Sequence, residues 1–264
     1  TGNTREVTAS DLEMTLKTSI AIEDVQEEGE IAVPAKLLTD SLKEFPDLPL
    51  QFSTEANEDI LNISWMSGAS KIPFFPADDY PALPELGDMA ISATFPSPIL
   101  LPGINNTIYA TAEDEIRPVM NGIFFDMTPE STTLVATDSH KLVYYTRNDV
   151  KAAEKCSFIL PKKPAAILRT LLGKSDDIVK VTFDMKNAYF EFEGNILICR
   201  LQERTYPAYR SVLPKNNPNK LVISRVQLLN AVKRVAVCSN QSTSHVKLSL
   251  SFNKLVISAS DTNF

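Results

Sequence analysis

The chain has 264 residues, of which 44% are hydrophobic and 22% are charged, and its formal net charge is −7. This length predicts two or three domains of about 100 to 150 residues each, and the composition excludes a fibrous or disordered protein. The apolar runs are shorter than the roughly 18 to 20 residues of a membrane span, and no leader peptide is visible, so we expect a cytoplasmic protein without membrane contact.

The first predicted elements lie between residue 32 and about residue 110. Residues 32–36 lead into an apolar stretch with helical spacing, and residues 91–95 predict a strand. The next apolar stretch, to about Ala110, also has helical character, but Pro102 and Gly103 are both unfavourable in a helix interior. We therefore expect a kink or a late start in this helix.

The following elements are strands rich in Val, Tyr, Phe and Thr, separated by turn residues. They cover residues 117–127, 131–137, 141–148 and, as a short strand, 157–160. Pro161 stands where a helix start tolerates proline, and Gly173 is typical of a helix end. The apolar stripe between them is formed by Ala165, Ile167, Leu168, Leu171 and Leu172. Alternating residues then predict three strands, at 178–183, 188–193 and 196–202.

Short segments recur at a nearly constant spacing, which indicates a repeated domain. Similar segments surround Asp11, Asp138 and Asp261, which are 127 and 123 positions apart. Two further landmarks keep this spacing: Pro34 and Pro161 are 127 apart, and Tyr-Pro-Ala at residues 80–82 and 206–208 is 126 apart. Three independent landmarks at one offset are hard to produce by chance.

The repeat unit of about 125 residues predicts the domain organisation. We expect residues 1–91 to be the C-terminal part of one domain, residues 92–219 a complete second domain, and residues 220–264 the N-terminal part of a third. A complete domain contains strand, helix and three strands twice. The predicted fold class is therefore α+β, with antiparallel sheets.

Four stretches resemble the bacterial beta sliding clamps, the family of DNA polymerase III beta subunits: residues 7–14, 120–122, 135–142 and 206–215. The resemblance runs across essentially the whole chain. It implies the DNA clamp fold, in which helices line a DNA channel and sheets form the outside of a ring. It also implies that the chain lacks the start of the first domain and most of the third, which join two full-length subunits into a homodimer ring.

The resemblance implies a non-catalytic DNA sliding clamp, or processivity factor, without cofactor or metal. Its partners are then duplex DNA, the alpha subunit of the replicative polymerase, the clamp loader and other proteins with a clamp-binding motif. Basic side chains are expected to contact phosphates without reading bases. The matching residues are Lys36, Lys43, Arg117, Lys162, Lys163, Arg169, Lys174, Arg204, Lys233 and Arg234. An ordinary solvated charge explains any one of them equally well.

The resemblance also implies a groove in which partners dock a short peptide with apolar anchors. The matching positions are Met120, Thr137, Ser139, His140, Lys141, Leu142, Pro207, Arg210 and Val212. Family members commonly have Gly at the position of Ser139 and Arg at that of Lys141, and we expect Ser139 to narrow the groove. Residues 113–115 are acidic where relatives place DNA contacts, so in that loop only Arg117 is assigned to DNA.

Other chemistries have little support in the sequence. Asp138, Ser139 and His140 contain the groups of a hydrolase triad, but neighbouring strand residues point to opposite faces. The three cysteines form no metal-binding pair, and we expect them, including Cys238 in a predicted helix, to be reduced and packed as small hydrophobic residues. The alternatives that remain are a repeat-built peptide-binding adaptor that never encircles DNA and, more distantly, an enzyme centred on Asp138 and His140.

Overall fold

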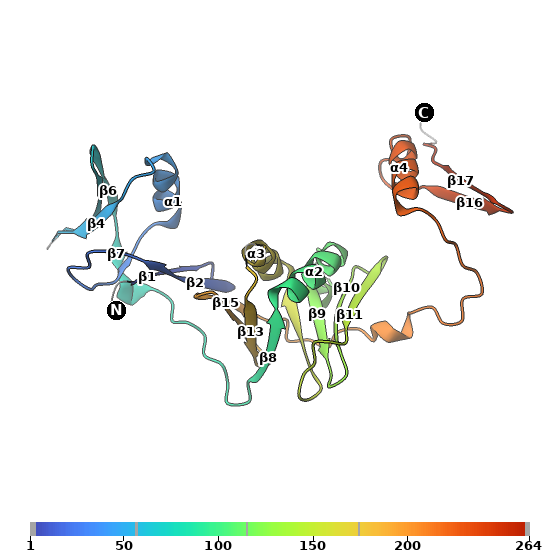
Figure 1. The fold of residues 1–264 in the computed structure, drawn as a ribbon, viewed down its shortest axis with the longest axis horizontal. Coiled ribbons are helices and arrows are strands. Elements are labelled where there is room, and N and C mark those ends of the chain that lie inside the picture. The colour runs from blue at the N-terminus through green and yellow to red at the C-terminus, as the bar shows by residue number, and fades with distance from the viewer. Residues whose placement is uncertain (1–3, 56–57, 115, 174, 262–264) are drawn as a thin grey trace. The chain divides into compact units, whose positions relative to one another are not determined.

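The structure is a computed structural model that describes residues 4–55, 58–114, 116–173 and 175–261. The chain divides into two compact units between Tyr209 and Arg210 (Figure 1). Within the described ranges, every helix is too short or too polar to cross a bilayer.

The first part of the first unit consists of short strands around one helix. Its elements are β1 (Thr4–Ser10), β2 (Met14–Ala21), β3 (Ile31–Ala32), α1 (Ala35–Glu44), β4 (Gln51–Thr54), β5 (Ile60–Trp65), β6 (Gly68–Pro73), β7 (Phe75–Pro76) and the 3-10 turn η1 (Ala77–Asp79). The helix predicted after residues 32–36 is confirmed as α1. Leu61, Ile63 and Ile72 are buried and form a small core beneath it.

The central part repeats strand, helix and three strands, as predicted. Its first set is β8 (Ile91–Pro96), α2 (Ser97–Thr107), β9 (Gly122–Met127), β10 (Thr132–Thr137) and β11 (Leu142–Arg147), with the 3-10 turns η2 (Ile108–Ala110) and η3 (Pro118–Met120). Its second set is β12 (Cys156–Pro161), α3 (Lys162–Leu172), β13 (Ile178–Phe183), β14 (Asn187–Phe192) and β15 (Asn195–Arg200). A further 3-10 turn, η4 (Tyr209–Ser211), follows. The predicted α+β class with antiparallel sheets is confirmed.

The core of the central part lies among two sheets and two helices. One sheet has the order β1-β2-β15-β14-β13-β8 and the other β11-β10-β9-β12. The helices α2 and α3 contact each other and lie side by side in Figure 1. Phe125 and Phe158 stack in the core with ring centroids 4.5 Å apart. Because β2 pairs with β15, one sheet continues from the central part into the start of the chain.

The strand predicted from Arg117 is wrong at its start. The structure places the 3-10 turn η3 at Pro118–Met120, and β9 begins only at Gly122. Proline has a fixed φ and no N–H to donate to a neighbouring strand, so Pro118 favours the turn over the sheet.

For the first central helix we expected a kink or a late start, and the late start is wrong. The helix α2 begins at Ser97 and continues through Pro102. Packing explains why a glycine occupies position 103 inside the helix, because a Cβ atom at this position would lie 3.0 Å from Leu134 Cδ2 on β10. Glycine therefore allows α2 to approach the sheet closely, and this contact outweighs its low helix propensity.

The second unit contains α4 (Arg225–Ala236) and the hairpin of β16 (Lys247–Ser251) and β17 (Lys254–Ser258). Cys238 lies beyond the end of α4 and is exposed, so its predicted place on a packed helix is wrong. The helix ends two residues before Cys238, which removes the thiol from the helical face. Cys156 and Cys199 are buried as expected, and burial raises the pKa of the Cys199 thiol to about 12.

Candidate functional site

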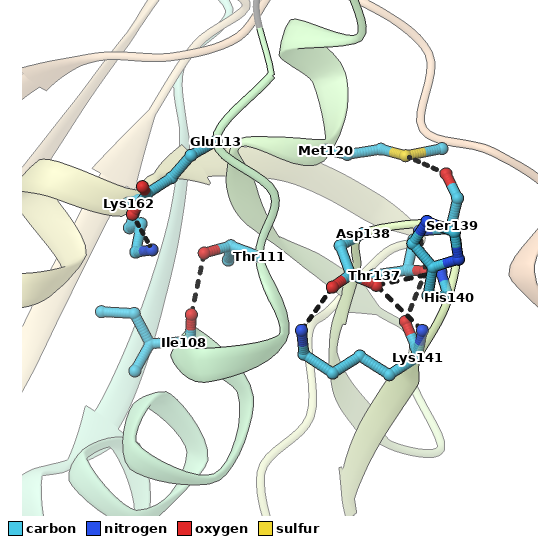
Figure 2. Close-up of polar contacts among 10 residues, drawn as sticks. All are labelled: Ile108, Thr111, Glu113, Met120, Thr137, Asp138, Ser139, His140, Lys141 and Lys162. Carbon is cyan, nitrogen blue, oxygen red and sulfur yellow. Dashed lines mark hydrogen bonds and ion pairs between the residues drawn. The ribbon is translucent and has the colours of Figure 1, made fainter. Parts of the chain in front are cut away.

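A hairpin turn closed by side chains joins β10 to β11 (Figure 2). Asp138 Oδ1 accepts hydrogen bonds from the backbone N–H groups of His140, at 3.0 Å, and Lys141, at 2.8 Å. Thr137 Oγ1 donates to the Lys141 carbonyl at 2.7 Å and accepts from the Ser139 N–H at 3.1 Å. The Asp and Thr side chains therefore hold every residue of the turn.

The turn between β1 and β2 has the same hydrogen bonds. Asp11 Oδ1 accepts from the N–H groups of Glu13, at 3.1 Å, and Met14, at 2.9 Å. Ser10 Oγ donates to the Met14 carbonyl at 3.2 Å and accepts from the Leu12 N–H at 3.2 Å. Each of these residues stands 127 positions before its counterpart in the β10–β11 turn. The sequence repeat therefore corresponds to a repeated structure.

The Asp138 side chain is fully engaged in its turn. Lys141 Nζ donates to Asp138 Oδ2, and this hydrogen bond, with those from the backbone, holds the pKa of the carboxyl well below its usual range. Such a carboxylate is a poor proton acceptor near neutral pH, and the hydrogen bond that it accepts from His140 comes from the backbone N–H of that residue. These contacts stabilise the conformation of the turn. Among the described residues, no cluster of His, Cys, Asp or Glu is arranged to hold a metal ion.

Ser139 has a strained backbone at the tip of this turn. Its φ is +77°, in the left-handed region, which costs a residue with a Cβ atom about 1 to 2 kcal/mol. Its hydroxyl accepts a hydrogen bond from Arg117 Nη1 and donates to Met120 Sδ at 3.4 Å. Arg117 Nε also donates to Asp114 Oδ2 at 3.0 Å. Arg117 therefore links the turn to the segment that precedes β9.

Replacing Ser139 with glycine is expected to raise the free energy of unfolding by about 1 kcal/mol, because glycine adopts a positive φ without the Cβ clash. For a chain of this size the melting temperature then rises by about 2 to 4 °C. Ser139→Ala is the matched control, since it loses the hydroxyl but keeps the strain. Thermal unfolding followed by circular dichroism compares the two variants. If the glycine variant is no more stable than the alanine variant, the inferred backbone strain at Ser139 is wrong.

An aromatic cluster lies beside the turn. Its buried members are Val135, Ile159, Tyr206 and Tyr209, and Val119, Phe124 and Leu142 pack against them. The rings of Phe124 and Tyr206 stack with centroids 4.7 Å apart, and the Tyr209 hydroxyl donates to Asp126 Oδ2 at 2.8 Å. The polar side chains of the turn therefore lie next to a packed apolar cluster.

The seven predicted groove residues of the first unit lie in or near the turn and the cluster. They are Met120, Thr137, Ser139, His140 and Lys141 in or against the turn, Leu142 against the cluster, and Pro207 directly after Tyr206. Arg210 and Val212 belong to the second unit, in which Val212 is 68% exposed. Val119, Tyr206 and Tyr209 also pack here and are not among the predicted residues. The Tyr-Pro-Ala-Tyr motif is the available sequence signal for both tyrosines.

The basic residues predicted to contact phosphates are spread over three helices and two loops. Lys36 and Lys43 lie on α1, Lys162, Lys163 and Arg169 on α3, Lys233 and Arg234 on α4, and Arg117 and Arg204 in loops. Four are in ion pairs, which are Lys43–Asp40 at 3.2 Å, Arg117–Asp114 at 2.9 Å, Lys162–Glu113 at 2.5 Å and Lys163–Asp11 at 2.5 Å. Lys174, and Thr262 at the end of the third repeat segment, lie outside the described residues.

Three domain models of one family match the chain in consecutive order. They are the N-terminal domain of the DNA polymerase III beta subunit at residues 2–84, its central domain at 95–208 and its C-terminal domain at 210–264. The central-domain match includes the β10–β11 turn and most of the aromatic cluster.

Individual relatives agree with these models. A beta sliding clamp of Synechococcus elongatus is 28% identical over 252 residues, which are 92% of this chain but 65% of the relative's length. That of Pseudomonas aeruginosa is 27% identical over 98% of this chain and 71% of the relative. The crystal structure of a DnaN sliding clamp from Pseudomonas aeruginosa bound to griselimycin is similar at a TM-score of 0.93, with 27% identity, over 100% of this chain and 71% of that chain. The chain therefore belongs to the DNA polymerase III beta subunit family, the beta sliding clamps.

Proposed function

We propose that the chain acts in a DNA sliding clamp, a non-catalytic processivity factor that encircles duplex DNA as a homodimer ring and tethers the replicative polymerase. The similarity to a DnaN sliding clamp over the whole chain, at a TM-score of 0.93, carries this proposal. The proposed organisation is part of a first clamp domain in residues 1–91, a complete second domain in 92–219 and part of a third in 220–264. The proposed location is the cytoplasm.

The proposed DNA contacts are the basic residues of α1, α3 and α4. Long basic side chains on helices contact phosphates without reading base sequence, as a protein that moves along DNA requires. The net charge of −7 limits the total attraction to the phosphate backbone. Such a balance favours sliding, because strong contacts raise the barrier to each step.

The proposed partner groove has the β10–β11 turn and the aromatic cluster as one wall. Its occupants are short peptides with apolar anchors from the polymerase alpha subunit, the clamp loader and other proteins with a clamp-binding motif. The side chain of Leu142 supplies an apolar contact, since it is partly buried and packs against the cluster. We assign Arg117 to this wall as well, because it hydrogen-bonds to Ser139.

Loading onto circular DNA tests the proposal. After incubation with a clamp loader and nicked plasmid, the full-length subunit is expected to co-elute with the circle in gel filtration at a salt concentration that dissociates ordinary contacts. Cutting the plasmid with a restriction enzyme is expected to release it. Equal retention on circular and linear DNA overturns the clamp. A peptide-binding adaptor shows no dependence on DNA topology, and an enzyme centred on Asp138 and His140 shows turnover.

A further inference from the structure

Two lysines begin α3, and each is in contact with a carboxylate from a distant part of the chain. Lys162 Nζ lies 2.5 Å from Glu113 Oε1, and Lys163 Nζ lies 2.5 Å from Asp11 Oδ2. We propose that Glu113 and Asp11 compete with DNA phosphates for these lysines, so that each pair opens when the duplex is bound. The proposal rests on the proposed role of α3 in contacting DNA.

The carboxylates come from separate segments that the fold brings to α3. Glu113 follows η2, 49 positions before Lys162, and Figure 2 shows the two side chains meeting across the gap between their segments. Asp11 belongs to the β1–β2 turn. The Glu113 side chain is 79% exposed and that of Lys162 is 36% exposed, so water and a phosphate can both reach this pair.

The charges of both pairs are present at neutral pH. The hydrogen bond from Lys162 lowers the pKa of Glu113, and the hydrogen bond from Lys163 lowers that of Asp11. Both acids are therefore ionised at neutral pH. Exposed pairs of this kind are weak and open readily, because water screens them. A DNA phosphate is therefore able to displace either carboxylate.

Arg169 provides a contrast on the same helix. It is exposed on α3, and no carboxylate of the described residues forms an ion pair with it. A phosphate that contacts Arg169 displaces only water and counterions. A phosphate that contacts Lys162 also displaces Glu113, which must then be rehydrated and must attract a cation. That cation offsets one of those released from the DNA, so the contact is weaker and less sensitive to salt.

Glu113→Gln is the most direct test, because among the described residues the only hydrogen-bond partner of its carboxylate is Lys162. Asp11 also closes its turn, which makes it less suitable. Fluorescence anisotropy with a labelled duplex is expected to show tighter binding by Glu113→Gln at low salt. The plot of log affinity against log salt is expected to steepen by about 0.9, so the advantage falls about threefold between about 50 and 200 mM salt.

A double-mutant cycle separates the competition from a general change of charge. Lys162→Gln is expected to weaken binding, and Glu113→Gln is expected to have no effect on affinity or slope when Lys162 is already replaced. Glu130→Gln removes an exposed carboxylate from the β9–β10 turn and is the matched control, with little expected change.

The possible failures are distinguishable. If Lys162→Gln weakens binding but Glu113→Gln changes neither affinity nor slope, the DNA contact stands and the competition is overturned. The competition is also overturned if Glu113→Gln tightens DNA binding when Lys162 is already replaced. The same holds if Glu130→Gln tightens DNA binding to the same extent. If no variant, including the parent protein, binds duplex DNA even at low salt, the proposed DNA-binding role fails and the competition fails with it.

Discussion

Gly122→Ala is expected to lower the free energy of unfolding by about 2 to 3 kcal/mol. A Cβ atom at this position would lie 2.5 Å from the Leu160 carbonyl oxygen and 2.9 Å from Ile159 Cγ2. Both neighbours belong to β12, which pairs with β9 over six residues, so neither can move away without distorting the sheet. Overpacking against a fixed neighbour typically costs about 1 to 3 kcal/mol, and contact with backbone atoms places this site at the upper end.

Gly29→Ala is the matched control, since a Cβ atom there has no neighbour within 4 Å. Its stability is expected to stay within about 0.5 kcal/mol of the parent. Urea unfolding followed by circular dichroism measures both variants. Similar midpoints for Gly122→Ala and the parent protein would show that β9 and β12 are not packed as closely as the structure indicates.

Leu142→Asp is expected to abolish measurable binding of an apolar clamp-binding peptide. Burying one Leu or Phe side chain contributes about 1.5 to 3 kcal/mol, so two peptide anchors supply roughly 3 to 6 kcal/mol before the peptide is ordered. An aspartate beside the aromatic cluster removes an apolar contact and requires a charge to lose water when the peptide binds. A loss of one anchor already weakens binding by at least about tenfold. Fluorescence polarisation with a labelled peptide measures the change.

Two further variants make this result interpretable. Ile178→Asp introduces the same charge at a 60% exposed side chain on β13 and is expected to leave peptide affinity unchanged. Leu142→Ala tests the contact without a charge and is expected to weaken binding by a smaller factor. Thermal unfolding shows whether each variant is folded. Parent-like affinity in a folded Leu142→Asp protein is the outcome that rejects the groove.

Local patterns in the sequence were sufficient for most of the secondary structure. The alternation at 178–183 coincides with β13, and the stripe between Pro161 and Gly173 became α3 with Leu168 and Leu172 buried. These patterns work because one buried face repeats every two residues in a strand and every 3.6 in a helix. The prediction failed at Arg117, where the strand composition continued but Pro118 changed the local backbone.

Which side chains meet was decided by the tertiary structure. The repeated segments around Asp11 and Asp138 form turns with the same hydrogen bonds, because those bonds join residues at most four positions apart. Lys162 and Glu113 are 49 positions apart, Arg117 and Ser139 are 22 apart, and the clash that requires Gly122 comes from another strand. No local period encodes such contacts. They arise only when β9, β12 and the turns are packed together, and they place the acidic segment at 113–114 against the residues expected to bind DNA and partner peptides.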